Sequence, residues 1–112
     1  MTLQDVIDQL HLTVLTQPND FSAVTLTGGY ASDLLSCVMA GAQKGAVWIT
    51  LQAHLNIVAV AALLEMSAVI ITEDAQPDAA TIAKANEEGV TLLATAKLSY
   101  EVVGRLWEMG LR

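Results

Sequence analysis

The chain has little cysteine and little positive charge. Cys37 is the only cysteine in 112 residues, so the sequence excludes an internal disulfide framework and a multi-thiolate metal site. Five Lys and Arg residues stand against twelve Asp and Glu residues, which gives a formal net charge of −7. Nucleic-acid binding depends mainly on clustered basic residues, and the five here are scattered. We therefore expect no nucleic-acid partner.

Segments that would target the chain or anchor it in a membrane are also missing. A membrane-spanning helix needs about 20 predominantly apolar residues, and the richest apolar stretch here covers only residues 57–64. The first ten residues include Asp5 and Asp8, with neither the basic cluster nor the apolar core of a secretory signal. We expect a cytoplasmic protein without a membrane partner.

Apolar residues make up 54% of the chain and charged residues only 15%. A chain of 112 residues has the usual length of one domain, so we expect a single domain over residues 1–112. The apolar content is high for so small a chain, and it predicts that part of the apolar surface is covered by something other than water. We expect self-association, most simply as a homodimer, to cover this apolar surface.

Threonine recurs at near-equal intervals and closes four short apolar runs. The copies are Thr27, Thr50, Thr72 and Thr95, which lie 23, 22 and 23 residues apart. The runs cover residues 24–27, 46–50, 68–72 and 90–95, and a helical pattern follows each. Parallel strands need a crossover of a dozen or more residues, so this period predicts repeated β-α units. All four threonines are then expected at one edge of the sheet.

The start of the chain predicts a helix and then a short strand. Residues 2–5, Thr-Leu-Gln-Asp, resemble a capping box with Asp in place of Glu, and the apolar residues that follow lie on one helical face. Residues 11–16 alternate weakly between apolar and polar side chains, which favours an additional strand. The repeating units begin after a turn at residues 17–20.

Serine, proline and glycine bound the other expected helices. The positions are Ser32 and Ser99 as N-caps, Pro77 in a first helical turn, and Gly41, Gly89 and Gly110 as helix ends. Strands that alternate with helices of this length predict an α/β fold of layered β-α repeats. Its helices would cover one or both faces of a mainly parallel sheet.

The first repeat supplies a candidate ligand site, because ligands of open parallel sheets bind beyond the carboxyl ends of the strands. Thr27, Gly28 and Gly29 would let the backbone approach a ligand closely, and the N–H groups near Ser32 and Asp33 could hold an anion. The alternative is a tight strand-to-helix turn with positive φ at one glycine. For the four threonines, the alternative to a hydroxyl-lined crevice is that each hydroxyl satisfies an N–H at a helix end.

The second repeat adds Thr50, Gln52 and His54 to the candidate site. His54 could donate, accept or carry charge at neutral pH, and Asp33 from the neighbouring turn would be its partner in acid–base catalysis. A polar capping role for His54 is the alternative, and we favour it.

Motifs of several enzyme classes are missing. The two-glycine segment lacks the G-x-G-x-x-G spacing of dinucleotide sites and the Gly-Lys-Ser/Thr end of a P-loop. Gly-x-Ser-x-Gly does not occur, and no spacing of His, Cys or carboxylates matches zinc or calcium motifs. We expect no independent enzyme, no bound metal and no cofactor.

Two blocks, residues 24–36 (VTLTGGYASDLLS) and 47–61 (VWITLQAHLNIVAVA), together with the later Ile70-Ile71-Thr72, resemble the DRTGG domain family. Thr25-Leu26 stands where the Asp-Arg of the family name would precede Thr27-Gly28-Gly29. The resemblance implies a three-layer α/β fold similar to the N-terminal domain of HPr kinase/phosphatase. It also implies a regulatory role, since such domains accompany regulatory CBS pairs in some pyrophosphatases. Kinase activity is not implied, because this chain has no P-loop.

Two functions follow from these observations. The first is a small cytoplasmic regulatory or ligand-sensing module that self-associates and binds a nucleotide-like or anionic metabolite at the Thr27-Gly28-Gly29 edge. The second is a structural interaction module that docks on a larger metabolic enzyme and has no small-molecule site. The surplus of apolar residues, including Trp107 and Met109 of the last expected helix, supports the second. The alternative for this pair, which we favour, is ordinary core packing, since interfaces and cores share the same residue types.

Overall fold

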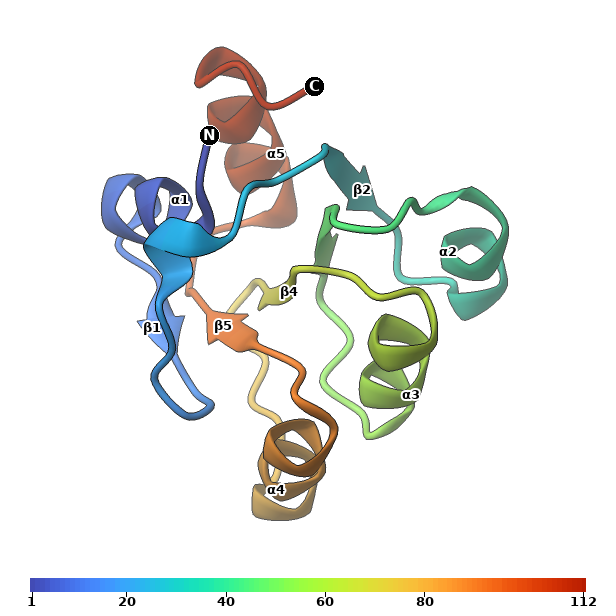
Figure 1. Ribbon diagram of the computed structural model, residues 1–112. Helices are drawn as coiled ribbons and strands as arrows, with labels where there is room; N and C mark the ends of the chain where they lie inside the picture. The colour runs from blue at the N-terminus through green and yellow to red at the C-terminus, as the bar shows by residue number, and fades with distance from the viewer.

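Five strands form one sheet, and helices cover both of its faces (Figure 1). The computed structural model describes residues 1–112. The order across the sheet is β1-β5-β4-β3-β2. The strands are β1 (Thr13–Val14), β2 (Gly29–Ala31), β3 (Val47–Thr50), β4 (Ala68–Ile71) and β5 (Leu92–Ala94). Strands β2 to β5 pair in parallel, and β1 pairs antiparallel to β5. The predicted α/β class, with a mainly parallel sheet, is confirmed.

Five α-helices and one 3₁₀ helix complete the fold. They are α1 (Leu3–Leu10), the 3₁₀ helix η1 (Phe21–Ala23), α2 (Leu35–Gly41), α3 (Asn56–Leu63), α4 (Ala79–Glu88) and α5 (Ser99–Glu108). Helices α1 and α5 contribute to the core on one face of the sheet, and α2, α3 and α4 contribute to the core on the other. None of these helices is both long enough and apolar enough to cross a membrane.

The central strands are buried on both faces, which explains why their sequences are continuous apolar runs. Side chains alternate between the two cores: Val47 and Ile49 of β3 pack under α1 and α5, while Trp48 packs under α2 and α3. Trp48 is fully buried, and its indole Nε1–H donates to the carbonyl oxygen of Ser32 at 2.8 Å. This contact fixes the segment that leaves β2 against the end of β3.

The predicted first helix and extra strand are present. The backbone N–H of Thr2 donates to the Asp5 carboxylate at 2.9 Å, and the backbone N–H of Asp5 donates to the Thr2 hydroxyl at 3.2 Å, so the capping box is complete. Helix α1 ends at His11, which adopts the left-handed conformation with φ of 53°. Strand β1 then occupies the centre of the segment in which a strand was predicted.

The predicted strand at residues 24–27 is wrong. The backbone of these residues pairs with the start of the chain instead: the N–H of Leu3 donates to the oxygen of Val24, and the N–H of Leu26 donates to the oxygen of Met1. Only an isolated antiparallel bridge, between Thr2 and Thr25, results. The first parallel strand begins later, at Gly29, so Thr27 precedes a strand rather than ending one.

Helix ends were predicted better than helix starts. Gly41 is the last residue of α2, Gly89 ends α4 with φ of 71°, and Gly110 lies just beyond α5 with φ of 99°. At the starts, Ser32 and Ser99 are not N-caps, because Leu34 and Leu98 hold those positions. Pro77 precedes the Asp78 N-cap of α4 and lies outside the first helical turn. The hydroxyls of Ser32 and Ser99 contact other groups at the carboxyl end of the sheet instead.

Helix α4 should lose stability in acid through its N-cap. The hydroxyl and the backbone N–H of Thr81 donate to Asp78 at 2.7 and 2.8 Å, and these bonds hold the pKa of Asp78 below its ordinary value of 3.8. A lowered folded-state pKa stabilises the fold above pH 3.8, and this contribution is lost as the pH falls through the folded-state value. We expect Asp78→Asn, which keeps a good N-cap, to flatten the decline of unfolding free energy in acid.

Urea unfolding of both proteins at several values between about pH 2 and pH 5 would measure this difference. Asp5→Asn should act additively with Asp78→Asn, because the Thr2 bonds lower the pKa of Asp5 in the same way. An unchanged acid slope in the Asp78→Asn protein would show that this cap contributes nothing to the pH dependence.

Candidate functional site

The predicted ligand-binding residues divide between the two ends of the sheet. Thr27 and Gly28 precede β2, and Gly29 is its first residue, so this segment lies at the amino-terminal end of the strands. Ser32 and Asp33 follow β2, while Gln52 and His54 follow β3, which ends at Thr50. Because β2 and β3 are parallel, these residues lie at the opposite, carboxyl end. The prediction that all four threonines share one edge is therefore wrong for Thr27 and correct for Thr50, Thr72 and Thr95.

At the carboxyl end, Asp33 joins the two loops that follow β2 and β3. Its carboxylate accepts hydrogen bonds from the hydroxyl of Thr50 and from the backbone N–H of Leu51, both at 2.8 Å. The side-chain amide of Gln52 donates to the backbone oxygen of Asp33 at 3.2 Å, and the N–H of Gln52 donates to the Thr50 hydroxyl at 3.0 Å. The structure thus brings Asp33, Thr50 and Gln52 together, and their polar groups bind one another.

The other two threonines at this end are also engaged within the protein. Thr72 is fully buried, and its hydroxyl contacts the backbone oxygen of Thr50 at 3.3 Å and shares a hydrogen bond with the hydroxyl of Ser99. The hydroxyl of Thr95 accepts from the N–H of Lys97 at 3.1 Å. These hydroxyls are therefore engaged within the protein, and none lines a free crevice. They bind loop and strand-end groups, and not the helix-end N–H groups of the alternative interpretation.

Carboxylates at this end also accept hydrogen bonds from backbone N–H groups, which are the donors that an anionic ligand would need. Asp33 accepts from Leu51, and Glu73 approaches the N–H of Ser99, at the start of α5, at 3.5 Å. Glu73 and Asp74 both have φ of 59°, and their N–H groups donate to the oxygens of Lys97 and Thr95. The acidic character of these loops disfavours an anion at the carboxyl end of the sheet.

His54 has a local role. Its Nδ1 accepts from the backbone N–H of Asn56 at 3.2 Å, at the start of α3. No hydrogen bond joins His54 to Asp33. The geometry supports the capping role rather than the acid–base pair. The hydroxyl of Ser32 is likewise local, since it accepts from the N–H of Leu34 at 3.1 Å.

At the amino-terminal end, Thr27, Gly28 and Gly29 line a small pocket of about 180 Å³. The remaining lining residues are Tyr30, Gly41, Gln43, Ala46 and Arg112. Thr27 is held by the turn before β3: its hydroxyl donates to the oxygen of Lys44 at 2.8 Å, and its N–H donates to the oxygen of Gly45 at 3.1 Å. Gly45 has φ of 80°, and a Cβ there would lie 2.8 Å from the Thr27 methyl, so glycine is required at this turn.

Two residues that line this pocket, Gly28 and Arg112, carry groups that can bind an anion. The backbone N–H of Gly28 has no acceptor, although the oxygen of Gly28 accepts from Val47. The Arg112 guanidinium lies 5.2 Å from the centre of the Trp107 ring, and its Nε donates to the Trp107 oxygen at 3.3 Å. Its two terminal nitrogens have no carboxylate partner. Neither Gly28 nor Gly29 has positive φ, so the pair does not form the tight turn that was the alternative interpretation.

Sequence reasoning missed Arg112 because no motif connects it to the Thr-Gly-Gly segment. It reaches the pocket only because α5 packs beside β2, which brings the end of the chain to the start of that strand. A second, mainly apolar groove of about 140 Å³ adjoins the pocket between β2 and α5. Gly29, Tyr30 and Arg112 line both.

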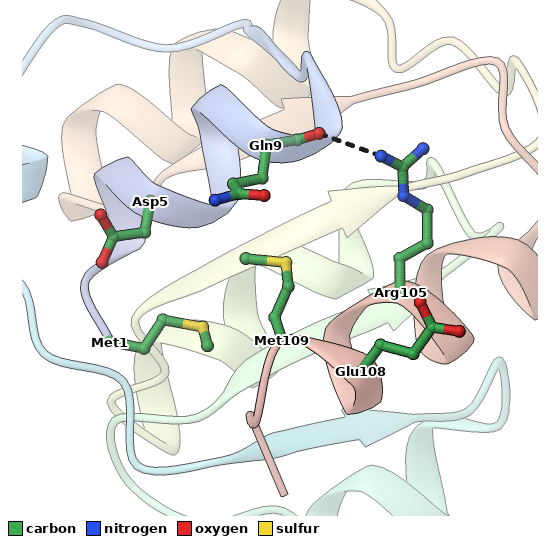
Figure 2. A pocket seen from close by; sticks show the side chains of 6 residues that line it. All are labelled: Met1, Asp5, Gln9, Arg105, Glu108 and Met109. Carbon is green, nitrogen blue, oxygen red and sulfur yellow. Dashed lines mark hydrogen bonds between the residues drawn. The ribbon is translucent and has the colours of Figure 1, made fainter.

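Another hollow, of about 590 Å³, is an open groove between α1 and α5 (Figure 2). Asp5 on one wall belongs to the capping box, and Arg105 on the other donates to the backbone oxygen of Gln9 at 3.2 Å. Met1 and Met109 lie between the walls. Because its polar groups already serve the two helices, we assign this groove no ligand. No group of three or more His, Cys, Asp or Glu side chains could hold a metal ion.

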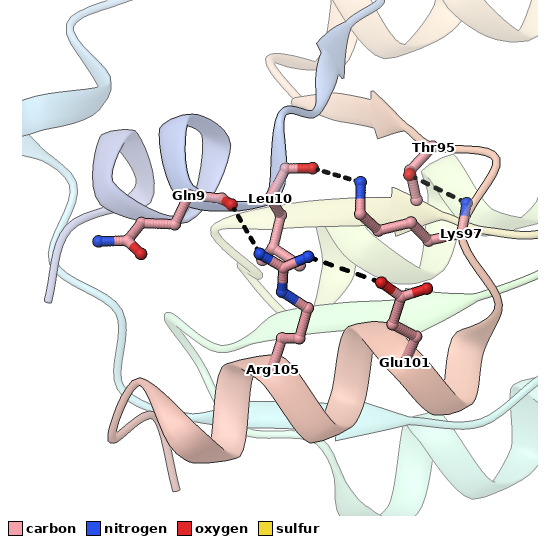
Figure 3. Close-up of polar contacts among 6 residues, drawn as sticks. All are labelled: Gln9, Leu10, Thr95, Lys97, Glu101 and Arg105. Carbon is pink, nitrogen blue, oxygen red and sulfur yellow. Dashed lines mark hydrogen bonds and ion pairs between the residues drawn. The ribbon is translucent and has the colours of Figure 1, made fainter.

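Side chains beside this groove bind the last carbonyl oxygens of α1 (Figure 3). Helix α1 has no basic residue in its last turn, and the cations come from the far end of the sequence. Lys97 donates from Nζ to the oxygen of Leu10 at 2.9 Å, and Arg105, which also pairs with Glu101 at 3.6 Å, donates to the oxygen of Gln9. Positive charge at helix carbonyls is favourable. Lys97 therefore binds the end of α1 and forms no ion pair with the acidic loops.

Comparison with known proteins bears on the fold. No protein-family model matches the chain, and no curated protein matches it. Among solved structures, it is similar to the CBS and DRTGG domains of the regulatory region of Clostridium perfringens pyrophosphatase, which were complexed with the activator diadenosine tetraphosphate. The TM-score is 0.74 at 16% sequence identity, and the match covers 92% of this chain and 44% of that one. The chain thus shares an α/β fold with part of a CBS and DRTGG regulatory region.

Proposed function

We propose that the chain is a small cytoplasmic regulatory module that self-associates and senses a nucleotide-like or other phosphate-bearing metabolite. The ligand's phosphate would occupy the pocket at Thr27, Gly28 and Gly29. The observation that carries the proposal is that Arg112 lines the same pocket as Gly28, whose backbone N–H has no hydrogen-bond acceptor in the chain. The acidic loops at the carboxyl end make that end the poorer choice.

The pocket's size and chemistry define the ligand class. A guanidinium binds phosphate through charge-assisted, often paired hydrogen bonds, and an unpaired backbone N–H adds a donor without a side chain in the way. Sites for whole drug-sized ligands usually measure about 300–1,000 Å³. A pocket of about 180 Å³ therefore fits one phosphate group, with the rest of the ligand outside. The pyrophosphatase region of similar fold binds an adenine nucleotide activator, which guides the choice of compounds to test.

Thermal unfolding in the presence of inorganic phosphate, adenosine mono-, di- and triphosphate and diadenosine tetraphosphate would test the proposal. We expect at least one nucleotide to raise Tm in proportion to the logarithm of its concentration, because it binds only the native state. Arg112→Gln should weaken its binding about tenfold or more, measured by calorimetry. Arg105→Gln is the matched control, since Arg105 lies outside the pocket.

Two results would contradict the ligand proposal. One is an unchanged Tm with every compound at millimolar concentration. The other is equal affinity of the wild-type and Arg112→Gln proteins, which would place binding elsewhere. The proposal includes no independent enzymatic activity, since the sequence has no P-loop and Asp33 and His54 form separate hydrogen bonds.

The second candidate is a structural module that docks on a larger metabolic enzyme. The specific observation in its favour is Trp107, which is 57% exposed and therefore is not a core residue. Met109, by contrast, is partly buried and packs against the core beneath α1 and α5. Affinity capture of the native protein would favour this candidate if a metabolic enzyme is recovered in equal amount and nucleotides do not bind.

A further inference from the structure

Strand β2 has one free edge. The N–H of Ser32 donates to the oxygen of Ile49, and the N–H of Val47 donates to the oxygen of Gly28, so even-numbered residues of this segment face β3. Backbone groups alternate along a strand, and those of Gly29 and Ala31 therefore face away from the sheet. Both residues are exposed. A row of unpaired backbone N–H and C=O groups at a sheet edge is a template for pairing with another strand.

No charged residue, proline or bulge within β2 guards that edge. Natural edge strands are usually protected by lysine, proline, inward charges or a bulge, and β2 reads Gly-Tyr-Ala. Tyr30 turns to the α2 side, where its hydroxyl donates to the oxygen of Cys37, so no large side chain stands on the α5 side of the strand. At the other edge of the sheet, β1 is only two residues long.

Exposed apolar side chains gather on α5. They are Tyr100, Val103 and Trp107 within the helix, with 91%, 37% and 57% of their surface exposed, and Leu98 just before it, with 59%. Tyr100, Val103 and Trp107 follow helical spacing and share one face. Val103 and Trp107 also line the groove against Gly29 and Ala31. The free edge of β2 and this face of α5 are therefore one continuous surface, which we call the β2–α5 face.

Gly104 adds a notch to the β2–α5 face. It lies inside α5, where glycine costs about 0.5–1 kcal/mol relative to alanine. A Cβ at this position would meet no atom within 4 Å, so packing within the chain does not require glycine. Tyr100, Val103 and Trp107 border the same open groove. The missing side chain leaves room for another helix to approach between two exposed aromatic rings.

The charges around this face favour a second copy of the chain. The whole chain carries a net charge of −7, so two copies repel each other over most of their surface. Beside the apolar residues of α5, however, Glu101 and Glu108 are balanced by Arg105 and Arg112. These four residues therefore add no net charge to the face. An enzyme chosen by charge would instead prefer the acidic surfaces elsewhere.

Symmetry also fits a second copy. A two-fold axis perpendicular to the sheet pairs β2 with β2 in the antiparallel sense. The free backbone N–H and C=O groups of Gly29 and Ala31 then face the C=O and N–H groups of β2 in the other copy. The same axis sets α5 antiparallel to its copy, which brings Glu101 near the start of one helix toward Arg112 beyond the end of the other. A standard interface buries about 800 Å² of solvent-accessible surface on each partner. This is a small part of the chain's accessible surface of 5818 Å².

We propose that two copies associate through the β2–α5 face, with β2 paired to β2 and the Trp107 side of α5 packed on its copy at Gly104. The sheet then continues across both copies. This inference rests on the self-association in the proposed function and specifies its surface. Because Arg112 lies at the border of the face and the phosphate pocket, ligand binding and pairing are coupled, each changing the other by the same factor.

Sedimentation velocity of the wild-type protein and three variants tests this surface. We expect a wild-type dimer, and a dissociation constant raised about tenfold or more in Trp107→Glu. Leu63→Glu on α3 is the matched control, because Leu63 is 67% exposed on the other side of the sheet; it should dimerise normally. Gly104→Ala should weaken the dimer, yet raise Tm when added to the monomeric Trp107→Glu protein, because alanine favours the isolated helix.

Amide exchange tests the strand pairing directly. The N–H groups of Gly29 and Ala31 should exchange more slowly in the wild-type protein than in Trp107→Glu.

A strictly monomeric wild-type protein would overturn this inference and the self-association together. A wild-type dimer that Trp107→Glu leaves intact would overturn only the β2–α5 face. Equal exchange at Gly29 and Ala31 in dimer and monomer would overturn the strand pairing. A monomer that instead binds a metabolic enzyme through Trp107 would show that the occupant is not a second copy.

Discussion

Trp48→Ala is expected to lower the free energy of unfolding by about 3–5 kcal/mol, the usual cost of truncating a buried Trp. Trp48 is fully buried in the middle of β3 and packs in the core beneath α2 and α3. Its removal leaves a cavity, and it also deprives the Ser32 oxygen of its indole donor. Urea unfolding followed by circular dichroism would measure the loss at constant slope, which shows that stability alone has changed.

Trp48→Phe separates the two causes. It keeps most of the buried volume but removes the Nε1–H, so its loss should be about 1–3 kcal/mol, the cost of an unpaired buried polar group. Leu63→Ala is the surface control, with an expected change within about 0.5 kcal/mol, because Leu63 is exposed. A loss below about 1 kcal/mol in Trp48→Ala would be incompatible with a fully buried side chain.

Asp33→Ala should cost about 2 kcal/mol, because the carboxylate accepts two hydrogen bonds that join the loops after β2 and β3. Truncation leaves the N–H of Leu51 without its acceptor and removes the acceptor of the buried Thr50 hydroxyl. Urea unfolding measures the loss. Nucleotide affinity should stay unchanged, because Asp33 lies at the opposite end of the sheet from the proposed phosphate pocket.

Asp33→Asn is the matched control for this prediction. Its amide oxygen can still accept both hydrogen bonds, so it should retain much of the stability that Asp33→Ala loses. Ser32→Ala should cost less than about 1 kcal/mol, since the Ser32 hydroxyl accepts only the N–H of Leu34. If Asp33→Ala unfolds like the wild type while nucleotide binding disappears, Asp33 belongs to a binding site and does not act by joining the two loops.

Much of the sheet could be predicted from local sequence. Strands β3, β4 and β5 are short apolar runs, and burial on both faces is the physical reason for their composition. The capping box at Thr2 and Asp5 and the glycine end of α4 were also predictable, because both depend on residues that are neighbours in the sequence. Local chemistry of this kind can be read without knowledge of the tertiary structure.

The segment at residues 24–27 shows why the first strand was misplaced. The alternation Val-Thr-Leu-Thr indicates an extended backbone, and the backbone of this segment does pair with another part of the chain. The partner is Thr2 at the start of the chain, however, and alternation carries no information about which segment pairs with which. The regular spacing of Thr27 with the other three threonines then placed it at the wrong end of the sheet.

The candidate site divides in the same way. The cluster of Asp33, Thr50 and Gln52 could be predicted, because parallel β-α units place the ends of neighbouring strands together. The role of this cluster could not be predicted. Its polar groups bind one another, and these hydrogen bonds depend on the backbone conformation of both loops. Arg112 was beyond prediction, because it reaches Gly28 only through the packing of α5 beside β2.

The closure of α1 has a consequence for the order of folding. A helix of eight residues is too short to persist alone in water. The side chains that bind its last carbonyls, Lys97 and Arg105, lie 87 and 96 residues further along the chain. The start of α1 pairs with residues close to it in the sequence, but its carboxyl end is fixed late, because both cations follow β5. Contacts of such long sequence separation slow folding, so the carboxyl end of α1 is capped only after α5 has packed.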